Sequence, residues 1–162
     1  RWVLSTMISR TYYHNFVTHL LEAAYQREVY RIIDQGGSVV ASTLSKITKD
    51  VLTKFWGDTV DIIDGAELTW MRQPHYYMGL YPYTYSAGLT VATEVSRRLL
   101  EDPTAIEDWK NVLLAGGTKS PVELAKMAKV DITTDQPLLN TIEHIGNMID
   151  QIIELTDQIE KA

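Results

Sequence analysis

The sequence predicts an all-α protein, a class that three observations support. Apolar residues recur at steps of three and four through most of the chain, as on one face of an α-helix. Glycine, proline and helix-capping residues separate these stretches. No segment shows the alternation of apolar and polar residues that is typical of a half-buried strand. We expect one helical region from residue 1 to residue 162.

The composition of the chain argues against several functional classes. The formal net charge is −6, from 15 basic and 21 acidic residues, and no basic block occurs, so we expect no nucleic-acid partner. No run of about 18 apolar residues occurs, so we expect no membrane span. The chain contains no cysteine, which excludes disulfides and thiolate metal sites and fits a cytosolic protein.

The first predicted helix runs from Trp2 to Ile33 and ends at Gly36 and Gly37. It has no initiator methionine, no signal-peptide pattern and no capping residue ahead of its first turn. We therefore expect Arg1 to be a cut end and the chain to be the C-terminal part of a longer protein.

Three possible metal ligands, His14, His19 and Glu22, lie on this first helix. Two ligands on one helical face should be three or four residues apart, whereas His14 and His19 are separated by about 140° around an α-helix. The chain also shows no four-ligand spacing of the kind that holds zinc. We expect these side chains to be solvated or to make interhelical contacts. A complete small metalloprotein that uses them is an alternative that their spacing disfavours.

A second helix is predicted from Ser38 to Trp56, with Gly57 as its C-cap. The segment 58–69 is acidic and resembles a calcium loop only superficially. Its acidic residues are Asp58, Asp61, Asp64 and Glu67. An EF-hand loop requires acids at positions 1, 3, 5 and 12, and steps of three do not match that pattern. We expect a solvated connector.

The chain after residue 100 is predicted to form two short helices and one long helix. Thr104 and Glu107 fit a capping box at the start of the first short helix. Ser120 and Glu123 fit a second capping box. The long helix is predicted over residues 137–161, where apolar residues again recur at helical spacing.

The most biased stretch of the chain runs from Trp70 to Ala92 and contains five tyrosines, one histidine and two prolines. Pro74 disfavours helical backbone at the preceding residue, so we expect a break just before His75. Pro82 suits the first turn of a helix, which the apolar spacing predicts from Tyr83 to Leu100. The expected result is a tyrosine-rich loop, residues 70–88, at the start of a helix.

The tyrosines of this loop have two interpretations. Tyr77, Tyr81 and Tyr85 are four residues apart, so on a continuous helix they would form one stripe and fill a seam between helices. In the second interpretation, the phenol groups and the imidazole of His75 donate hydrogen bonds to a polar ligand, and Gly79 allows close approach of the backbone. The residues alone do not decide between the two.

The sequence has no HExxH, no GxSxG, no glycine-rich phosphate loop and no cysteine nucleophile. The segments 70–77 and 80–88 nevertheless resemble the C-terminal region of oligoendopeptidase F, which belongs with the thimet oligopeptidase and neurolysin type of zinc metallopeptidases. Residues 114–124 and 130–133 resemble the closing segment of the same family. The resemblance covers nearly the whole chain.

This resemblance implies that the chain is a multi-helix part of a larger, neurolysin-like helical catalytic domain. The intact enzyme would be a cytoplasmic zinc metalloendopeptidase that cuts short peptides in a channel between helical halves. In this family, zinc is held by the two histidines of HExxH and a further glutamate, upstream of the part matched here. The chain alone would then bind no zinc and be inactive. Its partners would be an oligopeptide substrate and the missing N-terminal part of the same protein.

The resemblance also assigns roles to residues of the loop. His75 matches a functional histidine of the family, and Tyr81 and Tyr85 best match its functional tyrosines; Tyr83 stays a candidate. These residues and Gly79 would bind substrate, and His75, Tyr81 and Tyr85 would also stabilise the oxyanion. The alternative function is a non-enzymatic helical module that binds a peptide or a partner helix through the same aromatic groove.

Overall fold

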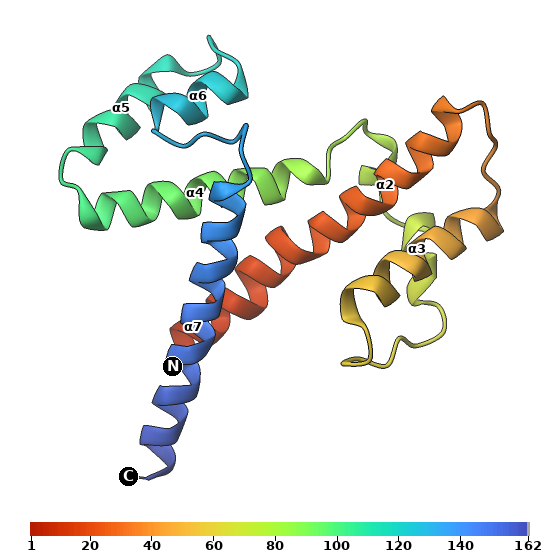
Figure 1. Ribbon diagram of the computed structural model, residues 1–162, viewed down its shortest axis with the longest axis horizontal. Helices are drawn as coiled ribbons and strands as arrows, with labels where there is room; N and C mark the ends of the chain where they lie inside the picture. The colour runs from red at the N-terminus through yellow and green to blue at the C-terminus, as the bar shows by residue number, and fades with distance from the viewer. Residues whose placement is uncertain (162) are drawn as a thin grey trace. The chain divides into compact units, whose positions relative to one another are not determined.

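The computed structural model describes residues 1–161, which form helices and turns without a β-strand (Figure 1). The predicted all-α class is confirmed. The first helical stretch has three parts, which are α1 (Trp2–Thr6), the π-helical segment η1 (Met7–Thr18) and α2 (His19–Asp34). The sequence predicted the span but not the π-helix, a geometry that rarely extends beyond one turn. Gly36, with φ +78°, follows the end of α2 as predicted.

The second helix, α3 (Ala41–Trp56), begins three residues later than the predicted start at Ser38. Val40 has extended backbone, with φ −119° and ψ 168°, a conformation that β-branched residues favour. Gly57 ends the helix as predicted, with φ +53°. Two short 3-10 helices, η2 (Ala66–Met71) and η3 (Pro74–Tyr77), then lead into the tyrosine-rich loop.

The remaining elements are α4 (Tyr83–Glu101), α5 (Ala105–Ala115), α6 (Pro121–Met127) and α7 (Gln136–Glu160). The capping box at Ser120 is confirmed, because Ser120 Oγ accepts from the Glu123 amide at 3.3 Å and the Glu123 carboxylate accepts from the Ser120 amide at 2.8 Å. The predicted box at Thr104 is wrong. The Thr104 hydroxyl instead donates to Asp102 Oδ1 at 2.7 Å, because an aspartate two residues upstream competes for it.

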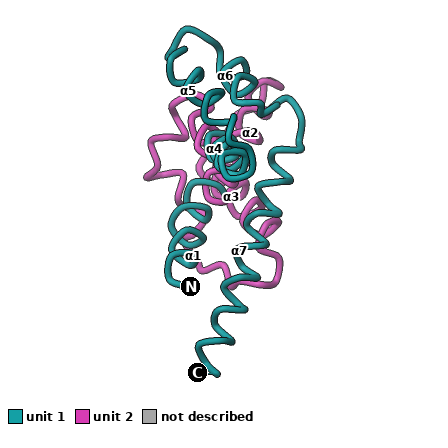
Figure 2. Tube along the Cα trace, turned by 90° about the vertical axis from the view of Figure 1, so that its left-hand side faces the viewer, with its two compact units in different colours: residues 1–16, 87–162 teal, residues 17–86 magenta. Residues whose placement is uncertain are grey.

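The chain divides into two compact units, residues 1–16 with residues 87 onward, and residues 17–86 (Figure 2). In the first unit, α5 and α6 pack together as a helical hairpin (Figure 1). Its buried core contains Val95, Ala128 and Val130. In the second unit, α3 packs against α2 and against η2, and the Trp70 indole N–H donates to Ser45 Oγ at 3.1 Å.

The acidic connector carries no metal-binding cluster. Asp58, Asp61 and Asp64 are exposed, and the Glu67 carboxylate accepts from the Gly65 amide at 2.9 Å. Within residues 1–161, no three His, Asp or Glu side chains lie close enough together to hold a metal ion. Over the same range, each helix is too short or too polar to pass through a lipid bilayer.

Candidate functional site

The tyrosine-rich loop is shaped by its two prolines and one glycine. Gln73 is extended, with φ −95° and ψ 101°, because Pro74 follows it, and the predicted break before His75 is confirmed. The chain then turns at Gly79, whose φ of +64° lies in the region that glycine adopts without steric cost. Pro82 is buried just ahead of the first residue of α4. The loop therefore returns to the start of a helix within a few residues.

Three of the predicted site residues form one aromatic cluster. The His75 and Tyr81 rings stack with centroids 5.2 Å apart and an interplanar angle of 23°. The Tyr85 ring meets Tyr81 edge-on at 5.4 Å and His75 at 6.4 Å. Tyr83 is 48% exposed and, in the part of the chain that the structure describes, has no ring contact with these three. We call His75, Tyr81 and Tyr85 the loop cluster.

The two interpretations of the tyrosines apply to different residues. Tyr76 fills a seam, because it is 6% exposed and its ring lies 4.8 Å from the buried ring of Tyr25. Tyr77 and Tyr81 are 67% and 37% exposed and lie on either side of the turn at Gly79 rather than on one continuous helix. The condition for a single stripe of Tyr77, Tyr81 and Tyr85, which was one continuous helix, is not met, because Gly79 and Pro82 interrupt the helix.

Hydrogen bonding within the loop cluster leaves Tyr81 as its outward donor. The Tyr85 hydroxyl donates to the Tyr81 hydroxyl at 3.1 Å, so the Tyr85 proton is already engaged. This hydrogen bond, with a smaller contribution from desolvation, raises the pKa of Tyr85 above its ordinary value, so its phenol stays protonated. Within residues 1–161, the Tyr81 hydroxyl accepts this hydrogen bond and its own proton has no acceptor. Its donor strength increases because it accepts at the same time.

His75 presents one of its two ring nitrogens. Nδ1 is buried and has no hydrogen-bond partner among residues 1–161. Because Nδ1 is enclosed, Nε2 is the ring nitrogen that remains for a hydrogen bond to a ligand. A neutral imidazole can donate from that position.

Helix α2 supports the loop cluster with polar side chains, His19 and Glu22, that the sequence did not predict as part of this site. His19 Nδ1 lies 2.6 Å from Glu22 Oε2, both side chains are buried, and the His19 ring lies 4.1 Å from the Tyr85 ring. Gln73 Nε2 donates to the other Glu22 oxygen at 3.4 Å. The signal available in the sequence was the i, i+3 spacing of a histidine and a glutamate on one face of a helix.

Of the two expected roles of His19 and Glu22, contact with other elements is confirmed and solvation is not, because their side chains are 4% and 6% exposed and contact Tyr85 and Gln73. They instead form the base on which Tyr85 rests. His14 is exposed, and no group of three potential ligands within residues 1–161 includes it. A metal role for His14, His19 and Glu22 therefore has no geometric support in this part of the chain.

The buried side chains of Tyr25 and Tyr76 should make the folded protein less stable at alkaline pH. Desolvation raises the pKa of Tyr25 from 10.0 to about 12, and it also raises the pKa of Tyr76. Because a raised pKa means that the folded state holds its proton more tightly, this stabilisation is complete below pH 10 and is lost as the pH rises toward 12. We expect the free energy of unfolding to fall across that interval in urea titrations. Tyr25→Phe should make the decline shallower, and a decline of unchanged slope would contradict the assignment.

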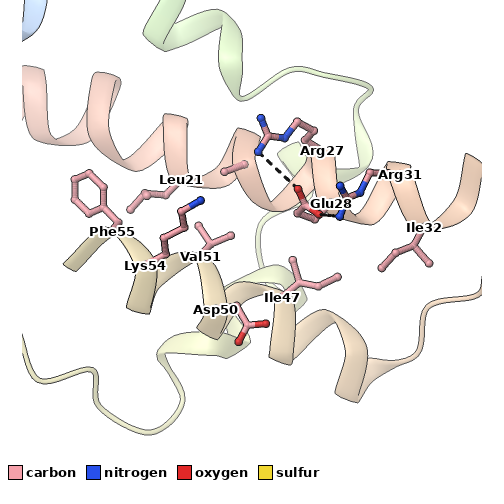
Figure 3. Close-up of a pocket in the computed structure, with 11 residues that line it drawn as sticks. Leu21, Arg27, Glu28, Arg31, Ile32, Ile47, Asp50, Val51, Lys54 and Phe55 are labelled. Atoms are coloured by element: carbon pink, nitrogen blue, oxygen red, sulfur yellow. Dashed lines mark ion pairs between the residues drawn. The ribbon is translucent and has the colours of Figure 1, made fainter. Parts of the chain in front are cut away.

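A separate groove lies between α2 and α3, with a volume of about 520 Å³ (Figure 3). Glu28 pairs with Arg31 at 2.8 Å and with Arg27 at 3.6 Å on its rim. Its apolar lining consists of Leu21, Ala24, Ile32, Ile47, Val51 and Phe55. None of the residues of the loop cluster lines this groove. The walls of the groove are helices, in which the backbone N–H groups are hydrogen-bonded within the helix and are not available to a peptide. The loop cluster is therefore the candidate site.

Comparison with known proteins decides the family of the chain. The sequence pattern of Peptidase family M3 matches residues 3–144. The chain belongs to peptidase family M3. The predicted likeness to oligoendopeptidase F is confirmed by similar sequences and by a similar solved structure.

Family M3 relatives align with most of this chain. Oligopeptidase PepF of Bacillus subtilis is 26% identical over 141 residues, which are 86% of this chain and 21% of the relative. An oligoendopeptidase F homolog of Borreliella burgdorferi is 25% identical over 138 residues, 85% of this chain and 23% of the relative. The chain thus spans about a fifth of the length of these family M3 relatives.

A solved crystal structure has a similar helical fold. Oligoendopeptidase-F from Enterococcus faecium matches with a TM-score of 0.81 and 25% sequence identity. The match covers 87% of this chain and 27% of that structure.

Proposed function

We propose that residues 1–162 form one helical region at the C-terminal, substrate-binding end of a cytoplasmic, zinc-dependent oligoendopeptidase that hydrolyses short peptides. Membership of family M3 supports the reaction class, and the names of the relatives support oligopeptides as substrates. The catalytic centre would be completed by a part of the enzyme that this chain does not supply. The chain by itself would therefore be inactive.

The observation that carries this proposal is the loop cluster. The rings of Tyr81 and His75, which lie on either side of the turn at Gly79 in the sequence, stack with their centroids 5.2 Å apart. Tyr81 is 37% exposed, so part of its side chain can contact a bound peptide. A pair of neutral donors held at a fixed separation suits a carbonyl oxygen.

The chemistry of peptide hydrolysis needs such donors. Attack of water on a peptide carbonyl develops negative charge on the carbonyl oxygen. Donors aimed at that oxygen stabilise the transition state more than the ground state, and each is worth about 3 kcal/mol. A phenol, with a reference pKa of about 10, keeps its proton at neutral pH. Tyr81 and His75 would donate, while Tyr85 would polarise Tyr81 through their hydrogen bond.

The residues described here do not fit a zinc site. No three His, Asp or Glu side chains of residues 1–161 are grouped for a metal, and His19 and Glu22 are already paired at 2.6 Å. A zinc site needs three or four such donors. We propose that residues outside this chain hold the zinc of the intact enzyme, and we assign no metal-dependent step to the loop cluster.

Substitution of Tyr85 in the full-length enzyme tests the proposal. We expect Tyr85→Phe to lower kcat/KM for an internally quenched peptide about tenfold, because Tyr81 loses the donor that polarises it. Tyr77→Phe is the matched control, since its hydroxyl donates to the Trp70 carbonyl at 3.0 Å outside the loop cluster. The Tyr77→Phe variant should change kcat/KM less than about twofold.

Three outcomes would contradict parts of the proposal. Equal effects of Tyr85→Phe and Tyr77→Phe would remove the loop cluster from the reaction. A full-length protein that binds peptides without cleaving them would favour the non-enzymatic module. Full activity of the 162-residue chain alone would contradict a catalytic centre completed elsewhere.

A further inference from the structure

One face of α2 is polar and lies against the tyrosine-rich loop. His19, Glu22, Gln26 and Tyr30 follow one another at steps of three and four, so they share one side of the helix. Each contacts the segment 73–85. His19 contacts the Tyr85 ring, and Glu22 accepts from Gln73. Gln26 donates to the Tyr76 and Gly79 carbonyls, and Tyr30 donates to the Gly79 carbonyl. A helix face that is buried against a neighbour is usually apolar, so these four polar residues require an explanation.

Gln26 is the most enclosed of the four, with 1% of its surface exposed. Its Nε2 donates to the Tyr76 carbonyl at 3.0 Å and to the Gly79 carbonyl at 2.6 Å. Because both partners are acceptors, the amide nitrogen must face them. One side chain thus holds the two ends of the turn that separates His75 from Tyr81.

A glutamine at this buried position has an energetic cost as well as two hydrogen bonds. Its Oε1 is buried and has no hydrogen-bond partner among residues 1–161, which is unfavourable. A methionine would fill a similar volume without burying that oxygen. What only the glutamine supplies is a pair of donors that fixes the backbone of residues 76–79.

We propose that Gln26 is a positioning residue of the peptidase, which sets the placement of the Tyr81 hydroxyl and the His75 ring by clamping the turn between them. The role rests on the function proposed above. Gln26 touches no reacting atom and acts through the loop. Tyr30 assists it, because its hydroxyl donates to the same Gly79 carbonyl at 3.0 Å.

The clamp can be tested in the 162-residue chain itself, by amide hydrogen exchange. We expect Gln26→Met to speed exchange of the amides of residues 75–81 about tenfold or more and to leave α3 unchanged. Tyr30→Phe, at a half-buried side chain, should give a smaller change at the same amides. Thr48→Val is the control, since Thr48 is 6% exposed and donates only within α3, to the Leu44 carbonyl. Unchanged exchange in residues 75–81 would overturn the clamp.

A double-mutant cycle in the full-length enzyme tests the effect on turnover. We expect Gln26→Met to lower kcat about tenfold or more with little change in KM, and Thr48→Val to lower it less than about twofold. In a Tyr81→Phe background, Gln26→Met should lower kcat less than about twofold, because the hydroxyl that Gln26 positions is already absent. If the effects of Gln26→Met and Tyr81→Phe on kcat are fully additive, then Gln26 has a merely structural role and the proposal is overturned.

The cycle also separates this proposal from the proposed function. If Tyr81→Phe alone leaves kcat/KM unchanged, the proposed function fails and the positioning role fails with it. If Tyr81→Phe has a large effect and Gln26→Met has none, only the positioning role fails.

Discussion

Replacement of Tyr81 by phenylalanine is expected to lower kcat/KM of the full-length peptidase about 100-fold, mostly through kcat. The Tyr81 hydroxyl accepts from Tyr85 at 3.1 Å and keeps its own proton for a ligand. Its removal deletes a donor that is used more in the transition state than in the ground state. The measurement is steady-state hydrolysis of a quenched peptide by the wild type and the variant.

The comparison of Tyr81→Phe with Tyr85→Phe gives this prediction its sharpest test. Tyr85 acts through Tyr81, so Tyr85→Phe should lower kcat/KM less than Tyr81→Phe does. The double variant should have about the same kcat/KM as Tyr81→Phe alone. A larger effect of Tyr85→Phe would reverse the two roles. Equal KM and kcat for Tyr81→Phe and the wild type would remove Tyr81 from the site.

The second large effect is expected on stability. Glu22→Leu should lower the free energy of unfolding of the 162-residue chain by about 3 kcal/mol, because it takes a buried partner from His19 and Gln73. Glu22 is 6% exposed, and its two oxygens contact His19 Nδ1 at 2.6 Å and Gln73 Nε2 at 3.4 Å. Urea denaturation followed by circular dichroism measures the change.

The exposed ion pair between Lys46 and Asp50 on α3 provides the matched control. Its side chains are 74% and 61% exposed, so Lys46→Met should change stability by no more than about 0.5 kcal/mol. If Glu22→Leu costs as little as Lys46→Met, then the His19–Glu22 pair does not support the loop.

Local features of the fold followed directly from the sequence. The helical class, the break before His75, the helix ends at Gly36 and Gly57 and the capping box at Ser120 are set by residues close in the chain. Proline and glycine restrict or release backbone angles wherever they occur, so their effects need no tertiary context.

Competing local interactions explain the predictions that failed. Thr104 has a good capping pattern, yet Asp102 lies two residues away and takes its hydroxyl. The π-helical geometry of residues 7–18 leaves no trace in an apolar spacing that fits an α-helix equally well. Helix starts such as that of α3 shift by a few residues when the first residues prefer extended backbone.

The residues along the chain were enough to predict a helical protein with a tyrosine-rich loop and a resemblance to oligoendopeptidase F. The folded structure was needed to show that the Tyr85 hydroxyl donates to the Tyr81 hydroxyl, and that Glu22 and Gln26 hydrogen-bond to the loop. Local spacing fixes backbone conformation, whereas the partner of a side chain more than 40 residues away, such as Gln26 for Gly79, depends on how helices pack. Burial then turns a glutamine and a glutamate, which are usually solvated, into the support of the candidate site.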